Sequence, residues 1–100
     1  MSDSGKTSRM HYTYVLLCIN TKRNQNRFYI GSTDDYVKRV TEHKNKSVRT
    51  TKSFDQIELV YLEMCLNKTD ALKRELQLKT GFGRGYIKRR IENYLRNLRV

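Results

Sequence analysis

The fold is decided by residues 11–30, which read HYTYVLLCINTKRNQNRFYI. From His11 to Ile19 nearly every residue is β-branched, aromatic or aliphatic, and a second short run of this kind follows at Arg27–Ile30. The polar segment Asn20–Asn26 separates the two runs. This arrangement predicts two strands joined as a β-hairpin.

A helix is predicted to follow the hairpin. Gly31–Thr33 interrupt the strand pattern, and Asp34 and Asp35 supply carboxylates to the free N–H groups at the start of a helix. The helix is expected to run from about Asp35 to Asn45. Its apolar face would consist of Tyr36, Val37 and Val40.

The rest of the chain predicts one more strand and two helices. Ile57–Met64 is apolar at both parities, as in a strand covered on both faces. A helix is expected to begin near Asn67, with Ala71, Leu72, Leu76 and Lys79 at helical spacing, and Gly81–Gly85 are expected to end it as a turn. The last helix follows from an apolar stripe of Ile87, Ile91, Tyr94 and Leu98. The order β-β-α-β-α-α defines an α+β fold with a small, three-stranded, mostly antiparallel sheet flanked by helices.

The composition points to a polyanionic partner. The 21 Lys and Arg residues outnumber the 10 Asp and Glu residues, which gives a formal charge of +11, and nucleic acid is the commonest partner of such a domain. With 100 residues, 37% of them hydrophobic, we expect a flexible tail at residues 1–10 and a single domain at residues 11–100. No secretory signal or run of about 18 apolar residues is present, so a soluble intracellular protein without a membrane partner is expected. Cys18 and Cys65 form no C-x-x-C pair, which argues against a thiolate zinc site.

The most specific signal is an ordered set of polar residues spread along the chain. It consists of the triplets Tyr12-Thr13-Tyr14 and Tyr29-Ile30-Gly31, followed by Arg39, His43 and Glu75. In this set the sequence resembles the GIY-YIG nuclease family, in the compact form related to the nuclease module of bacterial excision-repair endonucleases. The resemblance extends from about Tyr12 to Tyr94. It departs from the family pattern at the first triplet, where Tyr12 and Thr13 stand in the places of Gly and Ile.

The resemblance implies a role for each of these residues. Tyr14 and Tyr29 would lie side by side, and one of them would activate a water molecule as general base. Glu75 would hold a single metal ion, Arg39 would bind the scissile phosphate, and His43 would assist Arg39 or the proton transfer.

The chemistry of this set is also sound without the resemblance. Phosphodiester hydrolysis requires neutralisation of the phosphate charge, which a carboxylate-bound cation and a guanidinium can supply. Mg²⁺ often takes only one or two protein carboxylates, so Glu75 is a sufficient protein ligand, with Mn²⁺ as the expected substitute. Because tyrosine has an unperturbed pKa of about 10, either a nearby cation such as Arg39, Lys52 or the metal must favour the phenolate, or proton transfer must be concerted with attack. No small-molecule cofactor is expected.

We therefore expect a metal-dependent endonuclease acting on DNA, which may be directed by DNA structure during repair or recombination. Its DNA contacts are expected from Lys52, Lys79, Arg84, Lys88, Arg89 and Arg90. The alternative is a non-catalytic nucleic-acid-binding module. In that case the tyrosines would be ordinary strand residues, Arg39 and His43 a solvated helix face, and Glu75 the partner of an i, i+4 ion pair with Lys79. A partner protein or a homodimer remains open.

Overall fold

The computed structural model describes residues 10–98. Its elements, in chain order, are β2 (His11–Asn20), β3 (Gln25–Thr33), α1 (Tyr36–Lys44), β4 (Gln56–Cys65), α2 (Lys68–Leu78), α3 (Gly81–Arg90) and α4 (Glu92–Leu98). Apart from Met10, the tail expected at residues 1–10 lies outside the described residues. Among residues 10–98, no helix combines the length and the apolar composition needed to cross a membrane.

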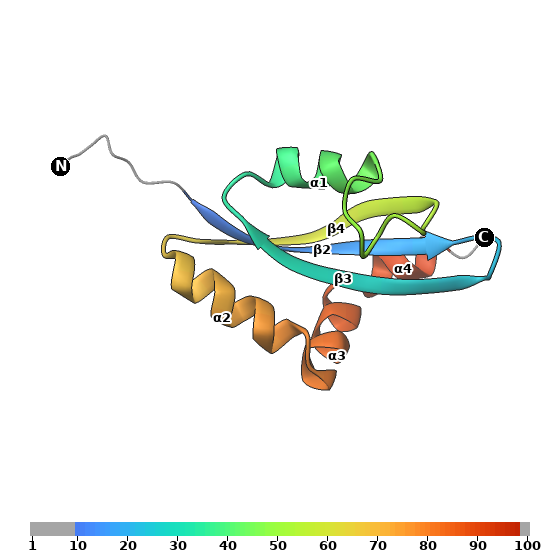
Figure 1. Ribbon diagram of the computed structural model, residues 1–100. Helices are drawn as coiled ribbons and strands as arrows, with labels where there is room; N and C mark the ends of the chain where they lie inside the picture. The colour runs from blue at the N-terminus through green and yellow to red at the C-terminus, as the bar shows by residue number, and fades with distance from the viewer. Residues whose placement is uncertain (1–9, 99–100) are drawn as a thin grey trace.

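The three strands form one antiparallel sheet in the order β3-β2-β4. The central strand pairs Tyr14 with Gly31 of β3 and with Leu62 of β4, and a bulge between Val15 and Leu16 shifts the register with β4. Helix α1 covers one face of the sheet, and α2, α3 and α4 lie on the other (Figure 1). The predicted α+β fold with a three-stranded antiparallel sheet is confirmed.

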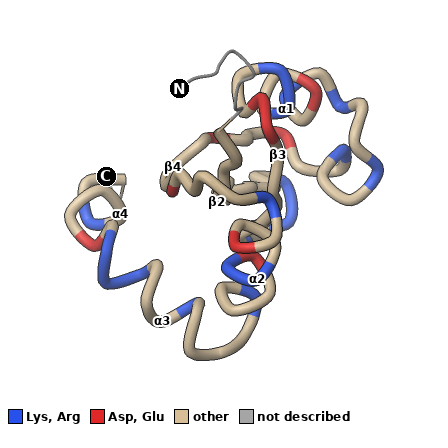
Figure 2. Tube along the Cα trace, turned by 90° about the vertical axis from the view of Figure 1, so that its left-hand side faces the viewer, with Lys and Arg blue, Asp and Glu red and all other residues tan. Residues whose placement is uncertain are grey.

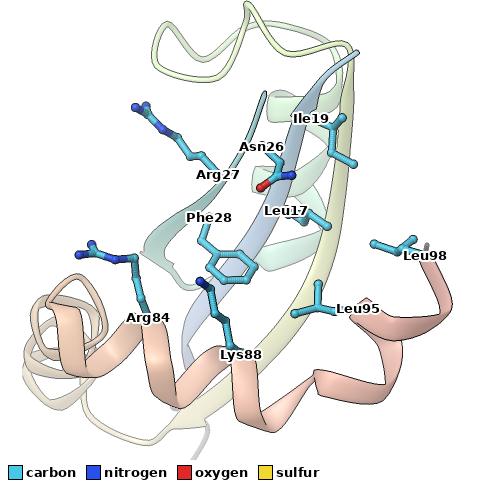
Figure 3. Close-up of a pocket in the computed structure, with 9 residues that line it drawn as sticks. All are labelled: Leu17, Ile19, Asn26, Arg27, Phe28, Arg84, Lys88, Leu95 and Leu98. Atoms are coloured by element: carbon cyan, nitrogen blue, oxygen red, sulfur yellow. The ribbon is translucent and has the colours of Figure 1, made fainter. Parts of the chain in front are cut away.

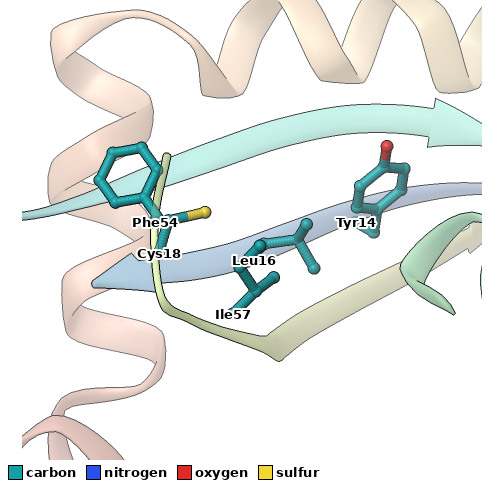
Figure 4. Packing of buried hydrophobic residues seen from close by; sticks show 5 residues of the cluster. All are labelled: Tyr14, Leu16, Cys18, Phe54 and Ile57. Carbon is teal, nitrogen blue, oxygen red and sulfur yellow. The ribbon is translucent and has the colours of Figure 1, made fainter. Parts of the chain in front are cut away.

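Each face of the sheet has its own hydrophobic core, because successive side chains of a strand point to opposite faces. On the α1 face, Tyr14, Leu16 and Cys18 pack with residues of the segment after α1 and of β4 (Figure 4). On the other face, Val15 and Ile30 pack against helical residues of the C-terminal half, among them Leu78 and Ile87. The unbroken burial of residues 13–18 therefore reflects a strand that supplies both cores.

The hairpin is longer than predicted. Gly31–Thr33 were expected to end the second strand, but β3 continues to Thr33, which pairs with Tyr12. Helix α1 begins after Asp35, whose side chain accepts a hydrogen bond from the Lys38 N–H. The expected N-cap is therefore present, and only the length of the strand was wrong.

The prediction of a glycine turn at Gly81–Gly85 is wrong. These residues form the first half of α3, and Thr80 caps that helix by accepting a hydrogen bond from the Gly83 N–H. A Cβ atom on Gly83 would lie 2.2 Å from the carbonyl oxygen of Leu78. Gly83 thus allows the start of α3 to pack directly on the end of α2.

Several predicted apolar faces also differ from the buried ones. Val37, Leu72 and Leu76 are exposed. The predicted Ala71 is buried in α2, together with Leu78. The expected last helix is two helices, because the backbone leaves the helical conformation at the buried Ile91, with φ −119° and ψ 27°. Tyr94 and Leu98, predicted for the apolar stripe, are exposed on α4. In each case packing against the sheet, and not the pattern of apolar residues, sets which side of the short helix is buried.

Candidate active site

Side chains from the two faces of the sheet meet at the edge strand β3, around Gly31. A Cβ atom on Gly31 would lie 2.5 Å from the Tyr14 hydroxyl oxygen, so the absence of a side chain lets the Tyr14 phenol cross this position. The next residue, Ser32, points to the other face, where its hydroxyl donates to Glu75 Oε1 at 2.6 Å. A tyrosine from one layer and a carboxylate from the other therefore flank the same two residues of β3.

Tyr14 is the first member of a buried hydrogen-bonded chain. Its hydroxyl oxygen lies 3.0 Å from His43 Nε2, and His43 Nδ1 lies 2.8 Å from Thr51 Oγ1. The Thr51 hydroxyl is also placed to donate to the Val48 carbonyl oxygen. If it does so, Nδ1–H donates to Thr51, and Nε2 is left to accept the proton of Tyr14. The exposed fractions of Tyr14, His43 and Thr51 are 1%, 0% and 1%, so water does not compete for these bonds.

Burial keeps both groups of the central bond neutral. Burial raises the pKa of Tyr14 to about 12, against the opposing effect of the Arg39 guanidinium, which interacts with the Tyr14 hydroxyl. Burial, followed by the charge of Arg39, lowers the pKa of His43 to about 4. For Tyr14 the loss of solvation outweighs the Arg39 guanidinium, so Arg39 by itself does not convert this tyrosine to a phenolate. The solvated helix face weighed for His43 is also wrong.

Tyr29 and Arg39 lie beside this hydrogen-bonded chain and are more exposed to solvent than its members. The Tyr29 ring contacts the His43 ring edge-to-face at 4.8 Å between centroids and lies 6.2 Å from the Tyr14 ring. The predicted proximity of the two tyrosines is thus present. The Arg39 guanidinium donates to Glu42 Oε1 at 2.9 Å, and its pKa is raised by Glu42 and then by Tyr14 and Tyr29. Arg39 is therefore a fixed cation beside both hydroxyl groups.

Glu75 lies at the opposite side of this edge, on α2. One of its oxygens accepts the Ser32 hydroxyl, and the other pairs with Lys79 Nζ at 2.8 Å, so the ion pair weighed as an alternative is present. Its side chain is 18% exposed, and its charge contributes to the raised pKa of Tyr14. Within the described part of the chain no cluster of three or more His, Cys, Asp or Glu side chains is present. A single carboxylate still fits Mg²⁺, which retains most of its water ligands, provided Lys79 moves aside.

Two other carboxylates, Glu58 and Glu63, lie on β4 and have partners of their own. Glu63 accepts two hydrogen bonds from Arg74, each 2.8 Å long, and Arg74 holds the pKa of Glu63 below its usual range. Glu58 lies 3.8 Å from Lys44. Glu75 is the one carboxylate whose charge acts on Tyr14 among the causes of its raised pKa.

The basic residues expected to contact DNA fall into three groups. Lys79 and Arg84 line a groove along the outer edge of β3, together with Tyr29 and Thr50. Lys88 lies one turn beyond Arg84 and lines a neighbouring pocket with it. The remaining three are exposed outside both: Lys52 in the segment after α1, and Arg89 and Arg90 on α3. Blue segments in Figure 2 accordingly occur both in the segment after α1 and along α3.

A family model of the GIY-YIG catalytic domain matches residues 10–88 of this chain. The chain belongs to the GIY-YIG family and is thus a nuclease-type hydrolase. The predicted resemblance is confirmed. No solved structure matches the chain significantly.

Its relatives include UPF0213 proteins of several bacteria. One from Staphylococcus epidermidis is 38% identical over 71 residues, which span 70% of this chain and 80% of the relative. One from Staphylococcus saprophyticus is 37% identical with the same coverage. One from Desulfotalea psychrophila is 33% identical over 70 residues, which span 68% of this chain and 59% of the relative.

The structure explains how the departure at the first triplet is accommodated. Tyr12 packs edge-to-face on Tyr36 of α1, with 4.9 Å between ring centroids. Thr13 is buried on the opposite face, and its hydroxyl donates to the Ala71 carbonyl oxygen at 3.0 Å. These two residues therefore attach one helix to each face of β2.

Sequence reasoning missed two polar residues of the site. Ser32 carries a usable signal, because strand alternation from Ile30 places it on the face that α2 covers. Thr51 carries none, since it lies in a segment whose threonines and basic residues are typical of an exposed loop. In the folded protein Thr51 is buried and contacts His43, whereas its neighbour Thr50 is exposed.

Proposed function

We propose that the protein is a divalent-metal-dependent endonuclease that hydrolyses phosphodiester bonds in DNA. The observation that carries this proposal is the meeting, at Gly31 and Ser32, of the Tyr14–His43 pair from one face of the sheet with Glu75 from the other. A partly exposed tyrosine and a guanidinium stand beside this point. Together these groups match what phosphoryl transfer requires: a proton acceptor, a fixed cation and a carboxylate for a metal.

The two tyrosines differ in their exposure to solvent, and we assign their roles from this difference. Tyr29 lines the open groove at the edge of β3, whereas Tyr14 is 1% exposed. A general base must come within hydrogen-bonding distance of the attacking water. Tyr29 is therefore proposed as the general base, whose phenolate, formed by loss of the hydroxyl proton to solvent, takes up a proton from the water, and Tyr14 is proposed as a positioning residue.

Arg39 is proposed to bind the scissile phosphate. Its pairing with Glu42 and the neighbouring Tyr14 hydroxyl fix the guanidinium in place. A cation held in this way stabilises charge on the phosphate without reorganising during the reaction. His43 and Thr51 act on this step indirectly, by holding Tyr14 in its orientation.

Glu75 is proposed to hold Mg²⁺, or Mn²⁺ in its place. When bound, such an ion neutralises charge on the phosphate and stabilises the leaving oxygen. Glu75 must first exchange its ion pair with Lys79 for the metal. The released Lys79 ammonium would then lie at the groove along β3, where it can contact a phosphate group.

The Lys79 ion pair also supports a second candidate, the non-catalytic nucleic-acid-binding module. With Lys79 2.8 Å away, the Glu75 carboxylate is neutralised and would not repel a phosphate backbone. Binding in both cases would weaken with salt, by a slope of about 0.9 per phosphate contacted on duplex DNA. Salt dependence therefore does not separate the two functions, but metal-dependent cleavage does.

The experiment is a cleavage assay on labelled single-stranded, duplex, flap and branched DNA, in Mg²⁺, Mn²⁺ or EDTA. Wild-type protein is compared with Glu75→Gln, and Glu58→Gln is the matched control, since Glu58 is exposed and lies away from the site. We expect cleavage in either metal, none in EDTA, and loss only in Glu75→Gln. Binding of DNA without cleavage by the wild-type protein would support the binding module instead.

The division between the tyrosines has its own test. Tyr29→Phe should abolish turnover while the free energy of unfolding changes little, because the Tyr29 hydroxyl makes no hydrogen bond within residues 10–98. Tyr14→Phe leaves His43 Nε2 without its buried partner and should cost about 1–3 kcal/mol of stability. Full activity in Tyr29→Phe would show that this assignment is wrong.

A further inference from the structure

A second concave site lies beside the candidate active site, on the face of the sheet opposite α1. It is a pocket of about 650 Å³ between the hairpin and the helices α3 and α4. Its apolar wall is formed by Leu17, Ile19, Phe28, Leu95 and Leu98. Figure 3 shows the Phe28 ring directed into the space between β2 and Lys88 of α3. The volume is in the range of pockets that bind small organic groups.

The charges around this pocket all have one sign. Arg84 and Lys88 come from successive turns of α3, whereas Arg27 of β3 directs its guanidinium away from the pocket, 5.9 Å from the centre of the Phe54 ring (Figure 3). The one other polar residue of the lining is Asn26, and none of the described lining residues is acidic. An apolar wall with an aromatic ring and a cationic rim is suited to a ligand with a flat apolar body and negative charges at its edge.

The pocket is continuous with the groove at the active site. Arg27, Phe28 and Arg84 line both, and the groove extends from them to Tyr29 and Lys79. Lys79 pairs with Glu75, so the same surface leads from the proposed metal ligand to the pocket. A nucleic-acid strand whose scissile phosphate lies at Tyr29 would thus bring a nearby nucleotide to Phe28.

We propose that this pocket binds an unpaired base of the DNA strand that is cut, with the base stacked on Phe28 and its flanking phosphates held by Arg84 and Lys88. This inference rests on the proposed function and specifies the substrate class as DNA with a single-stranded segment next to the cleavage point. A base within a duplex is stacked between its neighbours and cannot enter the pocket. Aromatic stacking supplies affinity without sequence preference, because every base has a flat face.

The test measures binding in EDTA, so that it does not depend on cleavage. The probes are a short single-stranded oligonucleotide containing 2-aminopurine, the same strand with an abasic site at that position, and the corresponding duplex. The variants are Phe28→Leu, which keeps an apolar side chain in the half-buried position, and Arg84→Gln. Arg89→Gln is the matched control, because Arg89 is an exposed arginine of the same helix outside the pocket.

We expect 2-aminopurine fluorescence to be quenched on binding and the intact strand to bind more tightly than the abasic one. Phe28→Leu should remove this preference, with a loss of about 5- to 100-fold in affinity for the intact strand. Arg84→Gln should weaken binding more than Arg89→Gln does. Equal affinity for intact and abasic strands in the wild-type protein would overturn the proposal, even if the protein cleaves DNA. A second result would also overturn it. If an acidic, leucine-containing peptide shifts the NMR signals of the pocket residues but does not displace a bound oligonucleotide, the pocket binds a peptide and the oligonucleotide binds elsewhere.

Discussion

Acidification from pH 7.5 to pH 5 should destabilise the protein through His43. The imidazole is completely buried between Tyr14 and Thr51, and its pKa is lowered to about 4, mainly by burial and then by Arg39. An unfolded histidine has a pKa of about 6.5. Between these two values the unfolded chain binds a proton that the folded protein does not, so the free energy of unfolding falls as the pH falls. For these pKa values the loss is on the order of 2 kcal/mol at pH 5.

The assay is urea unfolding of the wild-type protein and of His43→Gln at pH 7.5, 6 and 5. The variant lacks the titrating group, so its stability should change less over this range, whatever its absolute value at pH 7.5. The difference between the two pH profiles isolates His43 from the carboxylates, which contribute to both proteins. Parallel profiles, or an NMR titration of the His43 imidazole with a midpoint near 6.5, would refute the account of a buried neutral histidine.

Four substitutions test the packing of the fold and the chemistry of the site. Gly31→Ala should cost about 1–3 kcal/mol of stability and most of the cleavage activity, because its Cβ would displace the Tyr14 hydroxyl; unchanged turnover would contradict this. Gly83→Ala should lower the free energy of unfolding by a similar amount, measured as a lower denaturant midpoint, since its Cβ meets the Leu78 carbonyl. A Cβ atom on Gly85 would lie 3.8 Å from Arg89 Nη1, an ordinary van der Waals contact, so Gly85→Ala should instead stabilise α3 by up to about 1 kcal/mol. Arg39→Ala should lower kcat much more than it raises KM, because its contact is strongest in the transition state; a change in KM alone would indicate simple anchoring.

The surface charges and the exposed apolar residues were the parts of the sequence that carried least structural information. Leu72 and Leu76 have the spacing of a buried helical face, yet both are exposed on α2. The same helix buries Ala71, whose small side chain lets the sheet come close enough for Thr13 and Ser32 to donate hydrogen bonds to the Ala71 carbonyl oxygen. A pattern of hydrophobic residues cannot show that close approach of a helix to a strand favours the smaller residue.

The sequence by itself determined the class of fold, the hairpin with both tyrosines, the N-cap of α1 and the family. These features depend on local composition, strand alternation and the order of a few polar residues, all of which are present in the linear chain. Only the tertiary structure decided which groups are buried. It placed His43 and Thr51 beneath Tyr14, joined Ser32 to Glu75 across the sheet edge, and turned the Gly81–Gly85 segment into a helix that packs on α2. Each of these outcomes depends on contacts between residues far apart in sequence, where burial, and not the intrinsic preference of a residue, sets its conformation and its charge.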